Sequence, residues 1–271
     1  MFSQGRDALH TMALIGLRQG VLAIAIFSAA APVYAVDPDY DVRLGDLTEP
    51  GELSTGLHAV YAPSGARIPQ EGVRSGYHVL QLSPTFTWGL TRNTDIELQL
   101  YASAGPRGEY RMGGAKVELG WIPVRPAGER DDGYWLGAAL EAARLPRTAS
   151  SNDLDSEVKA IVGLRRNGWT FAANPALQKK LAGPGGGRPT LSLKATVTYQ
   201  VNDAVGVGVE HYAQLGELGH LGPLNEQAQH TFAVVDVRAK KWQVNFGVGR
   251  GLNDYSERWI LKTVVGLPFG S

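Results

Sequence analysis

The stretch "WQVNFGV", residues 242–248, decides the fold class of this chain. Apolar side chains return at every second position, which predicts a β-strand, because a helix would bring them back at three and four. Gly247, Gly249 and Gly251 resemble a phosphate-binding loop, but that loop needs a strand before it and a helix after it. No helical pattern follows, so we expect Gly247 and Gly249 on the polar face of the strand, where a crowded wall favours small residues.

The same alternation recurs along the chain and predicts an all-β protein. The connections alternate in length, and this rhythm is typical of a transmembrane antiparallel up-and-down β-barrel, here of about 12 strands, with tight turns at one end. The short connections are 91–94, 166–168, 202–204 and 240–241, and only 124–133 is long where a tight turn is expected. The expected strands are 52–62, 78–90, 95–104, 112–122, 134–144, 157–165, 169–178, 190–200, 205–215, 230–239, 242–249 and 258–269.

The first 35 residues read as an export signal. Arg6 and Arg18 precede an apolar run at 21–31, and small residues stand before the expected cleavage near Ala35. The run is too short to span a bilayer as a helix, which takes about 20 apolar residues. We therefore predict a signal peptide at 1–35, a polar N-terminal periplasmic segment at 36–51, and an outer-membrane barrel at 52–271. The sequence leaves open whether residues 36–51 enter the barrel.

Composition excludes several functions. The 26 basic and 26 acidic residues balance, which gives no basic surface for nucleic acid. Cysteine is absent, so disulfides and thiolate metal sites are excluded. The glycine-rich stretch 182–190 lacks the Lys-Ser/Thr ending of a phosphate loop and lies between two expected strands. No catalytic residue, cofactor or metal site is predicted.

Charged residues collect on one face of the expected strands. A basic residue facing the centre of a bilayer costs about 2–4 kcal/mol, so a membrane barrel turns its charges inward and its apolar residues outward. A soluble exported β-protein would sort the two faces in the opposite sense, and it remains the alternative. The candidate lumen-lining residues are His58, Glu97, Lys116, Glu118, Glu141, Glu157, Lys159, Arg165, Lys194, Glu210, Asp236, Arg238 and Lys262.

Aromatic residues gather at the ends of the expected strands, on the apolar face. A transmembrane barrel places such residues in rings at its two water–lipid boundaries, whereas a soluble sandwich has no reason to do so. The predicted girdle consists of Trp88, Trp121, Tyr134, Trp169, Tyr199, Trp242 and Phe269 at the periplasmic end, with Tyr61 and Trp259 at the other.

The export signal, the alternating strands and the ending "WILKTVVGLPF" resemble the outer-membrane β-barrels of Gram-negative bacteria. The stretches "GLTRNTDIEL", "VGVGVEHY" and "FGVGRGLNDYSERWILKTVVGLPF" are similar to a loosely defined family of outer-membrane transporter-like proteins, including those near phenol meta-cleavage pathways. The resemblance implies insertion by the barrel-assembly machinery, which reads a terminal aromatic residue. Phe269 is followed here by Gly270 and Ser271, which departs from that pattern.

Histidines are the candidates for an alternative, enzymatic function. Outer-membrane lipid hydrolases commonly place His and Ser two apart on one strand face, and no strand histidine of this chain has that neighbour. We expect His58 to lie in a lumen hydrogen-bond network. His211 points towards lipid in the expected register, and together with the mid-strand Pro84 and Pro175 it marks where a register could be wrong.

These observations favour an outer-membrane barrel that passively passes or binds small molecules through a polar, charge-lined lumen. Its expected partners are outer-membrane lipid, the assembly machinery and a small-molecule solute. A barrel enzyme acting on lipid or surface polymer, and a structural barrel with a plugged lumen, are the alternatives.

Overall fold

The computed structural model describes residues 39–66, 76–105, 107–128, 130–145, 150, 153–183, 187–239 and 242–269, and side chains are described up to residue 266. The predicted signal peptide and its cleavage near Ala35 lie outside the described residues. Among the residues described, no helix is long and apolar enough to cross a membrane.

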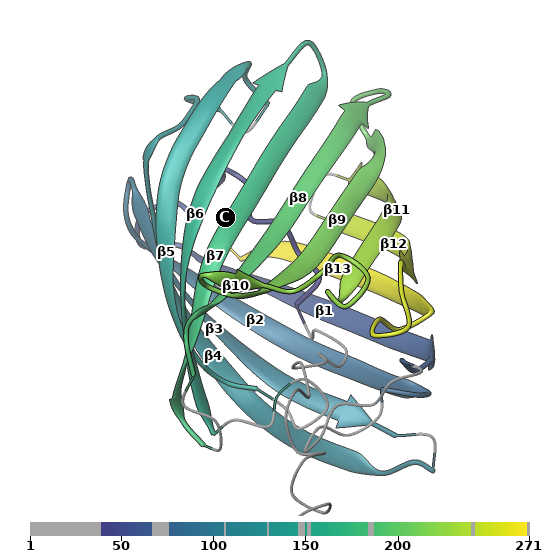
Figure 1. The fold of residues 1–271 in the computed structure, drawn as a ribbon. Helices are drawn as coiled ribbons and strands as arrows, with labels where there is room; N and C mark the ends of the chain where they lie inside the picture. The colour runs from purple at the N-terminus through teal and green to yellow at the C-terminus, as the bar shows by residue number, and fades with distance from the viewer. Residues whose placement is uncertain are drawn as a thin grey trace, which may run out of the picture. The chain divides into compact units, whose positions relative to one another are not determined.

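Twelve long antiparallel strands form one closed barrel (Figure 1). Each strand pairs with the next along the chain, and the barrel closes because β1 pairs with both β2 and β13. The two-residue β10 is an exception that pairs with the end of β9. The strands are β1 (Leu53–Ser64), β2 (Val79–Thr91), β3 (Thr94–Ala104), β4 (Tyr110–Val124), β5 (Gly133–Arg144), β6 (Leu154–Arg166), β7 (Trp169–Ala182), β8 (Thr190–Gln200), β9 (Val205–Glu217), β10 (His220–Leu221), β11 (Gln229–Ala239), β12 (Trp242–Gly251) and β13 (Trp259–Phe269).

The predicted fold class and strand order are confirmed, and only β10 was not expected. We call the end that holds the turns after β2, β6, β8 and β11 the short-turn end, and the opposite end the long-loop end. The long connection after β4 also lies at the short-turn end, as expected. It ties neighbouring turns together, because Arg125 Nη2 donates to the carbonyl of Arg92 at 2.7 Å and the Asn167 amide donates to Asp132 at 3.1 Å.

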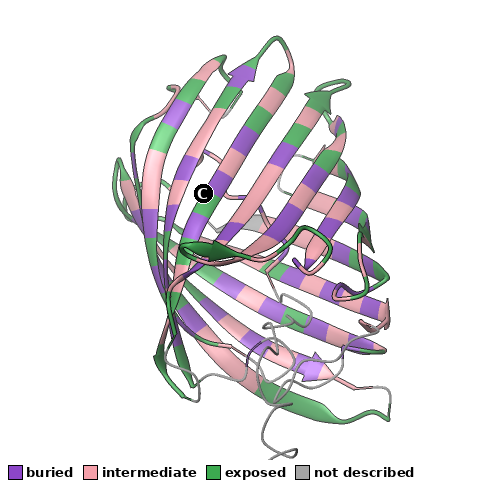
Figure 2. Ribbon diagram, viewed as in Figure 1, coloured by how far each residue is buried: buried purple, intermediate pink, exposed green. Residues whose placement is uncertain are grey.

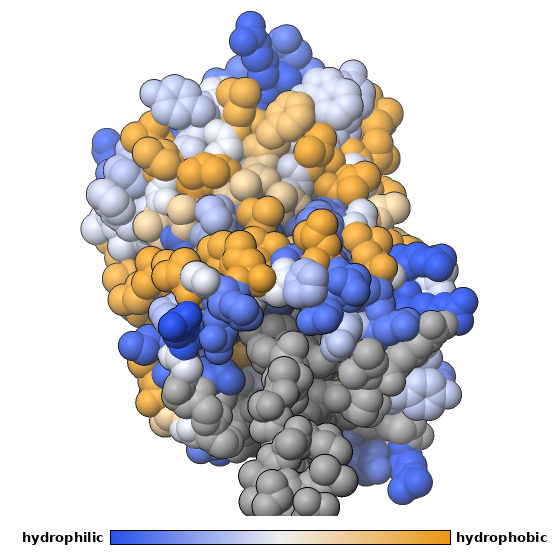
Figure 3. Space-filling model, in the orientation of Figure 1, coloured by the Kyte–Doolittle hydropathy of each residue, from blue (hydrophilic) through white to orange (hydrophobic). Residues whose placement is uncertain are grey.

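Burial alternates along the strands, with buried positions on the lumen side and exposed positions outside (Figure 2). The exposed positions are largely apolar, and apolar side chains cover the visible wall between more polar ends (Figure 3). Gly247 and Gly249 lie on the lumen side, where a Cβ atom would collide with Phe232 or Lys262. The crowded wall that their spacing predicted is therefore present.

The three positions where the register was in question keep the expected register. Pro84 and Pro175 leave gaps in the ladders with β3 and β6, but the pairing on either side of each gap continues without a shift. Burial of Glu210 and Tyr212 on the lumen side places His211 on the outer side, where its Nδ1 is 2.9 Å from Thr231 Oγ1. The hydroxyl of Thr231 gives the imidazole a polar partner on an otherwise apolar face, so no bulge is needed.

The outer face allows a direct test of its environment. Leu140 lies near the middle of β5 between Leu119 and Val158, and 57% of it is exposed. We expect Leu140→Arg to lower the free energy of unfolding in lipid vesicles by about 2–4 kcal/mol, because a guanidinium would face hydrocarbon. Leu224→Arg, in the connection after β10 where the residue is 74% exposed, is the matched control and should change little. Equal effects in denaturant titrations of the two variants would contradict a lipid-facing wall.

Candidate functional site

The charged residues of the wall project into the lumen and contact one another. Lys159 Nζ lies 2.8 Å from Glu118, 3.4 Å from Glu141 and 3.2 Å from Glu157. Lys262 pairs with Glu210. The lumen is therefore held by cross-strand ion pairs, and burial of most of these groups makes each unpaired charge expensive.

All of the predicted lumen residues lie on this inner side. Eight line a cavity described below: His58, Glu97, Lys116, Glu118, Lys159, Glu210, Asp236 and Arg238. The other five contact the inserted segment or the wall pairs: Glu141, Glu157, Arg165, Lys194 and Lys262.

Residues 39–50 lie inside the barrel, and we call them the inserted segment. The sequence analysis described 36–51 as a periplasmic segment and left open whether it enters the barrel, and the contacts of residues 39–48 place these residues in the lumen. The segment enters from the short-turn end, where Pro50 bridges Gly89 and Thr48 Oγ1 lies 2.9 Å from Ser54 Oγ. A polar segment is stable there because the charged lumen gives it partners that lipid would not.

Arg43 is the central anchor of the inserted segment. Its guanidinium donates to Asp95 Oδ1 from Nη2 and to Glu118 Oε1 from Nη1, each at 2.5 Å. The Asn174 side chain accepts from the backbone N–H of Arg43 at 2.7 Å and donates to its carbonyl at 3.0 Å. Three strands thus fix both the side chain and the backbone of one residue.

Asp39 and Tyr40 form a second anchor, deeper in the barrel. The Asp39 carboxylate lies 2.7 Å from Lys116 Nζ and 3.5 Å from Lys194 Nζ. Burial alone would raise the pKa of the Asp39 carboxyl, but these two ammonium groups hold that pKa well below its usual range. The Tyr40 carbonyl accepts from Lys262 Nζ at 3.0 Å, and its ring packs edge-on against Tyr212, with centroids 5.0 Å apart.

The barrel wall has space shaped for the inserted segment. A Cβ atom on Gly120 would collide with the Arg43 guanidinium, and one on Gly89 would collide with the backbone of residues 48 and 49. A Cβ on Gly45 of the segment would collide with the ring of Trp135, which is buried on the lumen side and also contacts Arg165. Glycine is therefore required on both sides of the contact.

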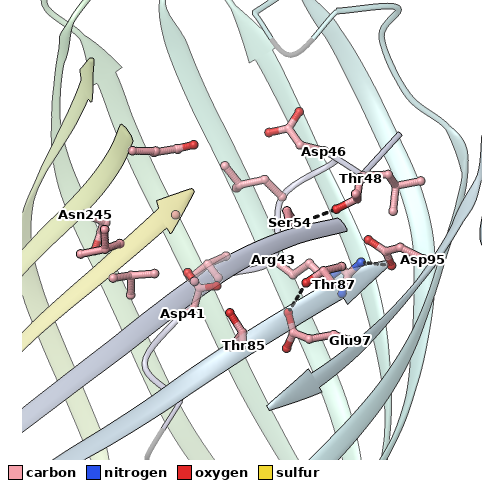
Figure 4. A pocket seen from close by; sticks show the side chains of 18 of the residues that line it. Asp41, Arg43, Asp46, Thr48, Ser54, Thr85, Thr87, Asp95, Glu97 and Asn245 are labelled. Atoms are coloured by element: carbon pink, nitrogen blue, oxygen red, sulfur yellow. Dashed lines mark hydrogen bonds and ion pairs between the residues drawn. The ribbon is translucent and has the colours of Figure 1, made fainter. Parts of the chain in front are cut away.

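A cavity of about 820 Å³ lies beside the inserted segment. Its lining includes hydroxyl groups, amides and charges of both signs. Residues that line it from the wall include Thr55, Thr85, Thr87, Thr196, Thr198, Asp236, Arg238 and Asn245. Figure 4 shows Arg43 directed towards Asp95, while Asp41 lies on the side nearer to Asn245. The cavity reaches the short-turn end, because Leu53 and Trp242 also line it.

His58 lies in a polar contact inside the lumen, and the serine opposite it is not accessible from the cavity. His58 Nδ1 lies 3.6 Å from Asp39, and His58 is paired in register with Ser83 across β1 and β2. Ser83 is 1% exposed and does not line the cavity, so a substrate would not reach its hydroxyl there. In the described part of the chain, no group of three or more acidic or histidine side chains has metal-binding geometry.

The predicted girdle residues project from the outer face. Their exposed fractions are 56% for Trp88, 54% for Trp121, 65% for Tyr134, 44% for Trp169, 40% for Tyr199, 54% for Trp242 and 40% for Trp259. Tyr61 is half-buried against His78, with its hydroxyl 2.7 Å from His78 Nδ1. The side chain of Phe269 lies outside those described.

Sequence reasoning missed the residues that hold the inserted segment. Asp95 and Asn174 fall on expected strands, and their place on the polar face was the signal that could have placed them inside, because Asp95 alternates with Glu97 and Asn174 lies on the same face as Gln178. Asp39 and Arg43 gave no such signal, because a polar stretch before a first strand is equally suited to solvent.

The comparisons with known proteins agree with this fold. No family model matches the chain, and no curated protein matches its sequence. Among solved structures, the KdgM porin is similar with a TM-score of 0.54 and 9% identity, covering 80% of this chain and 99% of that one. The NanC porin gives 0.52 and 10% identity, covering 80% of this chain and 100% of that one.

The COG4313 outer membrane channel from Pseudomonas putida F1 gives a TM-score of 0.54 and 12% identity, covering 86% of this chain and 100% of that one. The chain therefore has the fold of the outer-membrane porin-like barrels. At these identities the likeness concerns the fold, and the narrower resemblance to phenol-pathway proteins stays a prediction.

The Arg43 anchor predicts a stability loss. We expect Arg43→Ala to lower the free energy of unfolding in vesicles by about 3 kcal/mol, because among the described residues Asp95 loses its one ion-pair partner and Glu118 loses one of two. Arg43→Lys should lower the free energy of unfolding by less, because an ammonium keeps the positive charge but cannot donate to both carboxylates from two separate nitrogens. Arg258→Ala, at an exposed position between β12 and β13, is the control. An Arg43→Ala variant as stable as Arg258→Ala would show that the anchor contributes little.

Proposed function

We propose that this protein is an outer-membrane channel of a Gram-negative bacterium that lets small polar molecules cross passively. The observation that carries the proposal is a closed barrel with an apolar outer face and a cavity of about 820 Å³ lined by both signs of charge. Polar groups along the cavity replace part of the hydration of a solute, which lowers the cost of moving it through the barrel.

Further features support the proposed location. The exposed aromatic residues at the short-turn end suit a water–lipid boundary, and we place that end in the periplasm. The sequence pattern of residues 1–35 supports export with cleavage near Ala35, followed by insertion through the barrel-assembly machinery. The mature chain would then begin close to the inserted segment, and we propose no energy-coupling part for this barrel.

A small-molecule solute is the partner that a porin-like fold suggests. A KdgM porin of similar fold is described in complex with disordered oligogalacturonate. That complex supports a small-molecule solute as the partner here.

One observation favours a second function, a structural barrel with a plugged lumen. The inserted segment occupies part of the lumen and is anchored to strands around the barrel, namely β3, β4, β7, β8 and β13. If the cavity does not continue past the segment, the ion pairs would serve stability rather than passage.

Conductance separates the two functions. We expect purified full-length mature protein in planar lipid bilayers to show discrete conductance steps, and proteoliposomes to take up small polar solutes, because the cavity offers a polar route. Protein unfolded by heat before reconstitution is the control. A folded barrel that is silent in both assays would overturn the channel and support the plugged barrel.

A further inference from the structure

We propose that the inserted segment is a permanent inner wall of the pore and that Asp41, on this wall, gives the pore a preference for cations. This inference rests on the proposed channel function and assigns it a selectivity-determining residue. Two observations support it: ion pairs hold the segment in the lumen, and the segment brings carboxylates into the cavity that no basic residue offsets.

The segment is held too firmly to leave the lumen readily. Withdrawing it would expose Asp95 and Glu118 without the Arg43 guanidinium, and Lys116 without the Asp39 carboxylate. Removing one partner from a buried ion pair is strongly destabilising, and several pairs would break together. Withdrawal would also leave voids at the glycines that accommodate the segment, so solutes must pass beside it.

The segment also changes the charge balance of the cavity. The barrel strands contribute five acidic and three basic residues to the lining, and the connection after β4 adds Arg125 and Arg130, whereas residues 39–52 contribute five acidic residues and one basic residue. With the two arginines of that connection the rest of the lining balances, so the excess of acidic groups comes from the inserted segment and Glu52. A pore with excess carboxylates attracts cations and repels anions.

Contacts single out Asp41 among these carboxylates. Asp39 pairs with Lys116 and Lys194, so its charge is offset. Asp46 lies 3.6 Å from Arg165. Asp41, Glu49 and Glu52 line the cavity and make no ion pair with any described residue. Glu49 and Glu52 are exposed beside Gly89 at the short-turn end, whereas Asp41 is half-buried further inside, so its charge acts on whatever passes.

The wall around Asp41 strengthens its effect on a passing ion. Asp236 and Asn245 line the same cavity, and Asn245 Nδ2 donates to Asp236 Oδ1 at 2.9 Å. That bond orients the carboxylate without neutralising it. Arg238 is the basic residue two positions further along β11, and it offsets one of the two carboxylates. The remaining negative charge lies in the path between the segment and the wall.

The reversal potential of single channels under a salt gradient tests the selectivity. We expect the wild-type pore to favour potassium over chloride, and Asp41→Asn to reduce the permeability ratio by about two- to fourfold, since one charge near the path acts oppositely on the two ions. Asp203→Asn makes the same chemical change at an exposed position in the turn after β8, outside the cavity lining, and should leave the ratio unchanged.

Thiol labelling tests whether the segment stays in place, because the natural chain has no cysteine. Val42 and Asp41 both border the cavity, but Val42 is 6% exposed and packs in the same apolar cluster as Trp135, whereas Asp41 is only half-buried. In the folded barrel in vesicles, Asp41→Cys should react with a small water-soluble thiosulfonate, and Val42→Cys should stay protected.

The outcomes separate this inference from the channel itself. A conducting pore whose ion preference is the same in wild type and Asp41→Asn would overturn the role of Asp41 and leave the channel function standing. Equal labelling of Val42→Cys and Asp41→Cys would overturn the fixed wall. A protein with no conductance would overturn the channel function and this inference together.

Discussion

The two faces of every strand in this barrel meet different surroundings, and the rest of the structure depends on that constraint. Successive side chains of a strand point to opposite sides, so one face of each strand can be apolar and the other charged without any change in backbone. A closed barrel also leaves no unpaired strand edge, because β1 and β13 complete the ring of hydrogen bonds. Apolar residues then collect outside and ionic residues inside.

The charged interior creates a second requirement, which the inserted segment helps to meet. Buried carboxylates and ammonium groups are costly unless each has a partner of opposite sign. Arg43 lies between two carboxylates, and Asp39 lies between two lysines, so the segment supplies charge where the wall needs it. The same placement leaves Asp41 facing the cavity. Stability of the lumen and selectivity of the pore thus come from one short stretch of chain.

The barrel could be predicted from the sequence because its signal is local. Alternation in stretches such as 242–248 fixes which side chains share a face, and the cost of a charge in hydrocarbon decides which face points outward. The position of Gly247 and Gly249 on the crowded polar face was predicted correctly for the same reason. Alternation places both glycines on the lumen side, where a Cβ atom would collide with Phe232. Outward positions such as Trp88 and Trp121 also followed from alternation alone.

The inserted segment could not be predicted because its contacts are between residues far apart in the chain. Nothing in the stretch around Arg43 indicates that Asn174, 131 positions away, accepts from its backbone amide. A polar stretch without periodicity suits both solvent and a charged lumen. The short β10 was missed for a related reason, because two residues are too few to show alternation.

The orientation of the wall can be measured most directly by placing a nitroxide label on a cysteine in the folded barrel in vesicles. A label at Leu140→Cys should collide frequently with dissolved oxygen and rarely with a polar nickel complex, since oxygen concentrates in hydrocarbon. A label at Thr196→Cys, on the cavity side, should show more nickel contact and less oxygen contact. The opposite pattern at the two positions would show that the apolar face is not the one in contact with lipid, and the account of the barrel would be wrong.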